Sequence, residues 1–280
     1  MELIDKLTEL LPTAKRQTLK RLVEAGRVTV DSRRATRLKQ PIEADSVVKI
    51  QPARPKANPA EAMKPPFPIV YEDTDLIVID KPPGLLTSTT PNEPRPTALA
   101  ILRNYCAAVD PRVRVQAIHR LDRDASGLLV FAKSTIALAS LKTQFAAHTA
   151  QRIYAAVVSP TPKKPTQRIE SRLRERPDGS VYSARSGQLA VTEYVIVDSK
   201  PKRALLRVIL HTGRKHQIRV HLAENLTPII GDPIYDRPDP AGLLLAAIEL
   251  HFDHPRTGER KKFHLDLPPR LSNAMRDAER

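Results

Sequence analysis

The sequence contains no tryptophan and a single cysteine, Cys106, among its 280 residues. One thiol excludes an internal disulfide and any zinc site built on several cysteines. Aromatic residues make up only 4% of the chain, which argues against a single-strand binder built on stacked aromatic platforms. No apolar run approaches the roughly 18 residues of a membrane-spanning helix, and the first ten residues, MELIDKLTEL, carry acids early. We therefore expect no membrane association, no secretory signal and a cytoplasmic location.

Basic residues, in contrast, are in large excess. The chain has 46 Lys and Arg against 31 Asp and Glu, a formal net charge of +15. Such a surplus favours a polyanionic partner, because neutralising phosphates releases their counterions. An acidic membrane surface is the competing partner, but no amphipathic segment with a wholly basic face stands out. Nucleic acid is therefore the preferred partner.

The most informative stretch is residues 119–133, HRLDRDASGLLVFAK. Four charged residues within six positions precede a continuous apolar run, which is typical of a polar turn that leads into a buried strand. Asp122 lies between Arg120 and Arg123 and is expected to stay ionised beside them. A charged loop is more often simply a solvated surface loop. These residues alone leave both interpretations open.

A second polar segment, residues 210–222, reads LHTGRKHQIRVHL. The pattern predicts a strand, a glycine turn and a short helix, and basic residues at a helix start can bind phosphate. A metal site is the sharper alternative, since paired histidines on one helix face are common ligands. His216 and His221 are five positions apart, so their rings would diverge, and no nearby acid completes a zinc site. We expect no metal here.

The pattern of apolar residues and prolines divides the chain into an N-terminal unit, a linker and a second, larger domain. Residues 1–51 predict a helix over 15–22, capped by Thr13 and ending near Gly26, then strands at 27–30 and 47–50. Residues 52–68 are rich in proline, which predicts an extended linker. Within 69–280 we predict strands at 69–71, 76–79, 152–158, 192–197 and 204–210, with helices at 97–105 and around 138–145. The stretch 159–188 is basic and lacks periodicity, as expected of an insertion or a long hairpin with mobile loops.

Several of these segments resemble the RluA-type RNA pseudouridine synthase family. Residues 119–134 are similar to the family signature HRLD-x-x-TSG, with Ala125 in place of threonine. The segment RIYAAV matches K-x-Y-x-A, with Arg152 in place of lysine. Residues 210–221 match L-x-TGR-x-HQIRVH almost unchanged. The resemblance extends in order over about residues 69–270.

This resemblance implies an α+β fold with a large mixed, mostly antiparallel sheet and a central cleft. It implies isomerisation of uridine to pseudouridine in RNA without a metal or an organic cofactor. Asp122 would be the catalytic residue, as a nucleophile or as a base. Arg219 would hold Asp122 in a two-point pair, Tyr154 would stack on the target base, and Arg120 and Leu121 would support the loop. Arg214 and His216 would face the RNA.

The N-terminal segment, with "EAGRVTVDS" and "IEADSVVKI", is similar to the ribosomal-protein S-four-like RNA-binding domain. Asp31-Ser32 replaces the usual Asn-Gly, and Ala44-Asp45 replaces Gly-Asp. The resemblance implies a small α/β domain over residues 1–51 whose basic side chains contact the RNA backbone: Lys15, Arg16, Lys20, Arg21 and Arg27.

The sequence therefore predicts a monomeric RNA pseudouridine synthase that acts on large-subunit ribosomal RNA and not on DNA. Transfer RNA is the alternative substrate. An inactive RNA-binding ribosome-assembly factor is a second alternative, against which the intact Asp122, Tyr154 and Arg219 argue. A third interpretation rests on the similarity of residues 122–124 to the DxD pattern of metal-dependent glycosyl transfer. That pattern fixes only two residues, and metal dependence would distinguish it.

Overall fold

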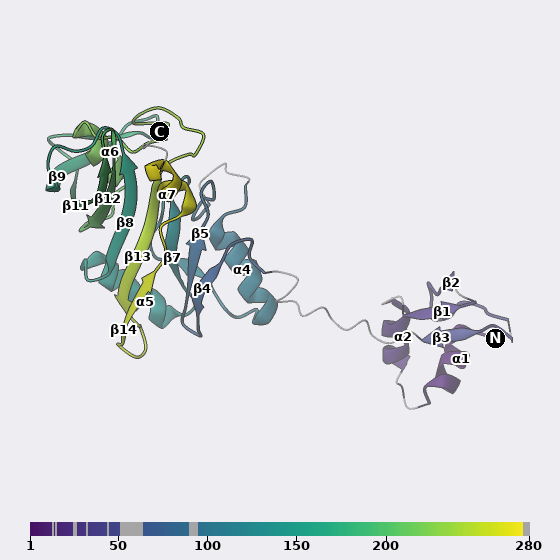
Figure 1. Cartoon of the computed structure of the whole chain (residues 1–280). Helices are drawn as coiled ribbons and strands as arrows, with labels where there is room; N and C mark the ends of the chain where they lie inside the picture. Colours follow the sequence, from purple (N-terminus) through teal and green to yellow (C-terminus); the bar gives the residue numbers. More distant parts are fainter. Residues whose placement is uncertain are drawn as a thin grey trace. The chain divides into compact units, whose positions relative to one another are not determined.

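The computed structural model describes residues 1–12, 14, 16–24, 27–31, 33–43, 45–50, 64–89 and 95–276. The chain forms two compact units, Met1–Ala62 and Met63–Arg280 (Figure 1). The predicted cap Thr13, the contact Lys15 and the helix end at Gly26 lie outside the described residues, as do residues 52–63 of the predicted linker and the side chain of Arg21.

The first unit packs two helices on a small sheet. Helices α1 (Leu3–Leu10) and α2 (Arg16–Glu24) accompany an antiparallel sheet of order β2-β1-β3, formed by Arg33–Arg34, Val28–Val30 and Val48–Ile50. Leu7 and Leu19 are buried against the sheet residue Val28 in one apolar cluster. On α2, Arg16 and Lys20 remain exposed, so this unit keeps a basic helical surface.

The second unit is built on one large sheet of strand order β10-β9-β11-β12-β8-β13-β7-β5-β4, with β14 paired to β13 and β6 to β7. Strands β8, β13 and β7 run side by side through its middle (Figure 1). All described pairs are antiparallel except β7 with β13. This arrangement confirms the predicted α+β fold. The strands are β4 (Ile69–Glu72), β5 (Leu76–Lys81), β6 (Gln116–Ala117), β7 (Ser126–Ala132), β8 (Gln151–Val158), β9 (Thr166–Glu175), β10 (Val181–Ser183), β11 (Gln188–Lys200), β12 (Arg203–Leu210), β13 (Leu245–Asp253) and β14 (Arg260–His264).

Helices pack on both faces of the sheet. They are α4 (Ala98–Val109), α5 (Thr135–Ala146), α6 (Gln217–Glu224), which lies against β10 and β11, and α7 (Pro269–Arg276). On β5, Ile77 belongs to the apolar cluster that contains Leu102 of α4, whereas Val78 belongs to the cluster that contains Leu141 of α5. Since successive side chains of a strand point to opposite faces, both faces are buried. This two-sided burial explains why β5 and β7 read as continuous apolar runs.

The stretch 159–188 is more regular than the sequence indicated. It contains β9 and β10, and β9 pairs with β11 over a continuous register from Thr166 to Leu173. Of the two expectations, the long hairpin is therefore the one observed. The sequence shows no clear strand period here because β9 buries only Ile169 and Leu173, while exposed charged residues occupy positions between them. A half-solvated strand near a sheet edge needs few apolar side chains.

One close backbone approach fixes the strand that follows the loop of Asp122. Gly127 has φ +109°, and a Cβ at this position would lie 2.1 Å from the carbonyl oxygen of Ala247 on β13. Only glycine avoids both the strain and the collision. The contact joins β7 to β13 where they run parallel, with Ala247 opposite Gly127.

We expect Gly127→Ala to lower the free energy of unfolding by about 3 kcal/mol, because overpacking and backbone strain each cost about 1–3 kcal/mol. Urea unfolding of the full chain measures this loss. Gly258→Ala is the matched control, since Gly258 also has a positive φ (+71°) but a Cβ there meets nothing within 4 Å. Equal losses in the two variants would contradict the close-approach argument.

Candidate active site

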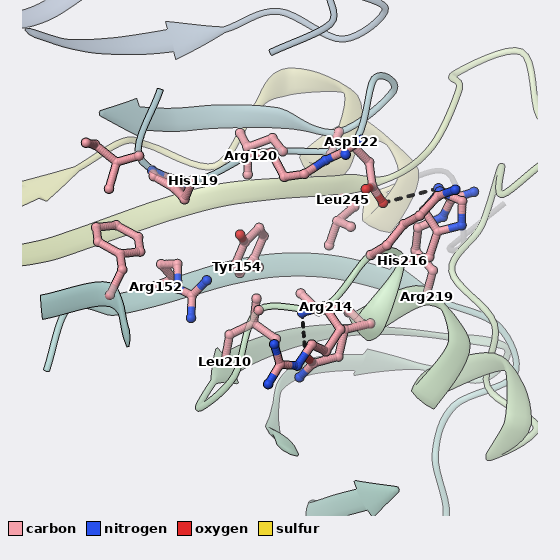
Figure 2. A pocket seen from close by; sticks show the side chains of 18 of the residues that line it. His119, Arg120, Asp122, Arg152, Tyr154, Leu210, Arg214, His216, Arg219 and Leu245 are labelled. Atoms are coloured by element: carbon pink, nitrogen blue, oxygen red, sulfur yellow. Dashed lines mark hydrogen bonds and ion pairs between the residues drawn. The ribbon is translucent and has the colours of Figure 1, made fainter. Parts of the chain in front are cut away.

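A cleft of about 650 Å³ opens in the second unit, between the loop that precedes β7, strand β8, helix α5 and the start of α6 (Figure 2). Asp122 is the one carboxylate among its described lining residues. The same wall carries six basic residues: Arg120, Lys142, Arg152, Arg214, Lys215 and Arg219. An isolated carboxylate in a basic cleft suits an anionic substrate that must be positioned against one acid.

The loop that carries Asp122 is held from both sides. The preceding Leu121 is buried, with its carbonyl accepting from the Thr87 hydroxyl and its amide donating to the same oxygen, each at 3.1 Å. The carbonyl of the following Arg123 accepts from the Nζ of Lys81 at 2.9 Å. These bonds position the carboxylate through its neighbours.

Lys81 is a fully buried lysine that the sequence analysis did not single out. Its Nζ also donates to the carbonyls of Pro82 and Leu85, so one ammonium group joins the turn after β5 to the loop of Asp122. Burial lowers the pKa of Lys81 to about 7, whereas the charges of Asp124 and Asp122 act to raise it. The feature of the sequence that could have pointed to Lys81 is its position directly before Pro82, at the end of a predicted strand.

Arg219 and Asp122 meet across the cleft, although they are 97 residues apart, with Nη1 of Arg219 3.2 Å from Oδ2 of Asp122 (Figure 2). The predicted two-point pair between them is wrong. Arg219 makes its two-point pair with Asp232, at 2.7 Å from both Nε and Nη2. The fork of the guanidinium is thus occupied by Asp232, and one remaining donor reaches Asp122.

This ion pair is almost completely removed from solvent. The side chains of Arg219, Asp232 and Asp122 are 3%, 1% and 16% exposed. Burial by itself lowers the pKa of Arg219, but the hydrogen bonds and charge of Asp232, with those of Asp122, outweigh it and raise the pKa above its usual value. The guanidinium is therefore permanently charged and rigid. Asp232 is the site residue that the sequence analysis missed, since nothing local marks an aspartate 13 residues away as its partner.

Tyr154 lies on β8 with its ring in the cleft wall and is 5% exposed. Burial raises the pKa of its phenol to about 12, with Arg152 lowering the pKa and Asp122 raising it. The phenol stays protonated at neutral pH. Tyr154 lies between Arg152 and Asp122 in Figure 2, so a planar group stacked on its ring would have the carboxylate at one edge.

His216 and His221 are both engaged in hydrogen bonds. The hydroxyl of Tyr235 accepts from the amide of Val181 and lies 2.9 Å from Nδ1 of His216, so it can donate to that nitrogen. Burial lowers the pKa of His216, which favours this neutral form. His221 has both ring nitrogens bonded to hydroxyls, of Thr192 and Ser171. Within the described ranges no group of three His, Cys, Asp or Glu could hold a metal ion.

The other predicted residues have different surroundings. Arg120 is exposed at the cleft wall. Arg123 pairs with its neighbour Asp124, at 3.0 Å, so the expected bracketing of Asp122 by two arginines gives way to the pair with Arg219. Arg214 lines the cleft and donates its Nε to the carbonyl of Leu189. Ala125, at the position where the family that the sequence resembles has threonine, is buried in the apolar core.

Comparison with known proteins identifies the family of this chain. The family model described as RNA pseudouridylate synthase matches residues 75–224, a range that includes Asp122, Tyr154 and Arg219. A protein of Chloroflexus aurantiacus named an uncharacterized RNA pseudouridine synthase is 37% identical over 98% of this chain and 89% of its own length. The chain belongs to the RNA pseudouridine synthase family.

Other members extend the comparison. The ribosomal large subunit pseudouridine synthase D of Nitrosomonas europaea is 34% identical over 96% of this chain and 81% of that protein. The solved structure of human RNA pseudouridylate synthase domain containing 4 superposes with a TM-score of 0.65, at 22% identity over 79% of this chain and 95% of that one. The fold is therefore that of a pseudouridine synthase, and the chain is an isomerase that converts uridine to pseudouridine in RNA. No helix in the described part of this synthase is long and apolar enough to cross a membrane.

Proposed function

We propose that this synthase modifies specific uridines of large-subunit ribosomal RNA, with Asp122 as its catalytic residue. The observation that carries the assignment is the Asp122 carboxylate, held by Arg219 at 3.2 Å in the wall of a basic cleft that also contains Tyr154. The ribosomal target is supported by relatives such as the Nitrosomonas europaea protein, whose name specifies the large ribosomal subunit. A cytoplasmic, monomeric enzyme is the form we propose.

In the proposed reaction the glycosidic bond is broken, the uracil rotates in place, and a carbon–carbon bond joins it to the same ribose. Asp122 starts the reaction as a nucleophile or as a base towards the ribose; either role requires an ionised carboxylate in a fixed orientation. Arg219 supplies that orientation because Asp232 fixes its guanidinium. A uridine within a helix cannot reach the cleft, so it must flip out or lie in a loop.

The first unit is proposed to be an S-four-like RNA-binding domain. Its support is the exposed basic surface of α2, where Arg16 and Lys20 lie, together with the motif similarity of residues 1–51. Such side chains would bind the RNA backbone and add affinity without reading sequence.

Tyr154 is proposed to stack on the target uracil. We expect Tyr154→Ala to lower single-turnover kcat/KM by roughly 10- to 100-fold, since base–aromatic stacking contributes about 1–3 kcal/mol. Tyr154→Phe is the matched variant and should stay within about threefold of wild type, because the ring face is kept and the phenol of pKa about 12 carries no charge to lose. A large loss in Tyr154→Phe would show that the hydroxyl, and not the ring, is needed.

The proposed function is tested by pseudouridine mapping of total cellular RNA from the source cell, with wild-type protein and with Asp122→Asn. Loss of one or a few sites in large-subunit ribosomal RNA supports the proposal and names the uridine. Loss of sites in transfer RNA would replace the ribosomal target by the alternative substrate. No lost site, with RNA binding retained, would favour an RNA-binding assembly factor.

A further inference from the structure

Arg152 is a buried arginine that has no partner charge among the residues the structure describes. It lies on β8, two residues before Tyr154, and is 8% exposed. Its guanidinium makes no hydrogen bond or ion pair with any residue in the described part of the chain, and its Nε is buried without a partner. An unpaired buried charge is unfavourable in a folded protein, so such groups normally have a counterion or a ligand.

The surroundings of Arg152 hold its guanidinium in place without neutralising it. The Cζ of Arg152 lies 5.4 Å from the centroid of the Phe145 ring, which also stacks on His119 at 4.6 Å. A Cβ on Gly213 would lie 2.3 Å from Nη1 of Arg152, so the glycine of the TGR segment leaves the room that the guanidinium occupies. The other buried side-chain atom without a partner in the described residues, Nδ1 of His119, flanks the same ring.

Most of the charged side chains near Arg152 are basic, as expected of a site that binds an anion. Burial lowers the pKa of Arg152 and the neighbouring charge of Arg214 lowers it further, while Tyr154 raises it. Lys142 and His148 line the same cleft. The carboxylate of the cleft, Asp122, is on the other side of Tyr154 in Figure 2 and is paired with Arg219.

We propose that Arg152, with Arg214 beside it, forms an anion subsite of the cleft that binds a backbone phosphate next to the target uridine. This assignment rests on the proposed function and adds the position of one phosphate to it. Arg152 and Tyr154 are two residues apart on β8, so their side chains point to the same face of the strand, about 7 Å apart. A nucleotide whose base stacks on Tyr154 therefore brings an adjoining phosphate within reach of the guanidinium. The planar fork of arginine matches a phosphate in a two-point contact.

The test uses the full-length chain and an RNA hairpin that carries the uridine identified by mapping. In one series, single phosphates around that uridine are replaced by neutral methylphosphonates. Binding is measured to the Asp122→Asn protein, which leaves the RNA unconverted, and to the Asp122→Asn/Arg152→Gln protein. Arg237→Gln is the matched control, since Arg237 is exposed and lies outside the cleft lining.

We expect one flanking methylphosphonate to weaken binding about tenfold to the protein with Arg152 and to have no effect when Arg152 is glutamine. Arg152→Gln should also reduce the salt dependence of log K by about 0.7, the value for one phosphate of a single strand. Its melting temperature should not fall, because an unpaired buried charge is removed. A purely structural role would lower the melting temperature and would show no coupling to a single linkage.

Two results would overturn the subsite. If Arg152→Gln converts the uridine with unchanged kcat and KM and no linkage shows coupling, the subsite is wrong and the proposed function stands. If the wild-type protein converts no uridine in any mapped RNA, the proposed function fails and the subsite fails with it. Where Arg152→Gln does not fold, Arg152→Lys replaces it; it keeps the charge but lacks the fork, and it should lose part of the coupling.

Discussion

Asp122→Asn is expected to lower the single-turnover rate of pseudouridine formation by about 10⁴-fold or more, with RNA affinity changed less than about threefold. An amide can neither attack the ribose nor accept its proton, so either proposed role of Asp122 is lost. The amide oxygen can still accept the hydrogen bond that Nη1 of Arg219 now donates at 3.2 Å. The measurement is conversion of a radiolabelled RNA by excess full-length protein.

The control for this variant is Asp124→Asn, two residues away. Asp124 pairs with the partly exposed Arg123, and its side chain is 31% exposed. Exposed pairs of this kind contribute at most about 1 kcal/mol, so the rate of Asp124→Asn should stay within about fivefold of wild type. A similar rate loss in both variants would mean that the loop is disturbed and would remove the support for Asp122 as the catalytic residue.

Asp232→Asn is expected to have the second largest effect. Asparagine offers one oxygen and an amino group where Arg219 now meets two carboxylate oxygens at 2.7 Å. Breaking a buried ion pair from one side costs about 3–5 kcal/mol. The freed guanidinium should then turn towards Asp122 or become mobile. We expect kcat to fall about 100-fold, a barrier increase of about 2.7 kcal/mol, while KM changes little.

The split between kcat and KM is what identifies Asp232 as a positioning residue. A general loss of folding would reduce the amount of active protein, which active-site titration with the RNA measures. Asp232→Glu keeps both oxygens and should recover part of kcat, whereas Asp236→Asn, at an exposed position four residues on, should behave as wild type. If Asp232→Asn keeps full kcat, the orientation of Arg219 does not limit the reaction.

The family, its reaction and many of the strands could be predicted from the residues alone. Asp122, Tyr154 and Arg219 were each predicted as site residues because the short motifs around them resemble those of the synthase family. The apolar runs of β5 and β7 predicted buried strands because a continuous apolar stretch between turn residues is a local pattern. Strand β9 was missed because its charged, half-solvated face masks the alternation that two buried residues carry.

The contacts between residues on opposite sides of the cleft could not be predicted in this way. Arg219 could be assigned to Asp122 by resemblance, but a sequence gives no distances, and the two-point pair proved to be with Asp232. The anchoring of the Asp122 loop by Lys81 and Thr87 joins residues more than 30 positions apart. The unpaired state of Arg152 likewise depends on which side chains surround it. Such contacts arise from the packing of distant segments, and no local pattern of residues encodes them.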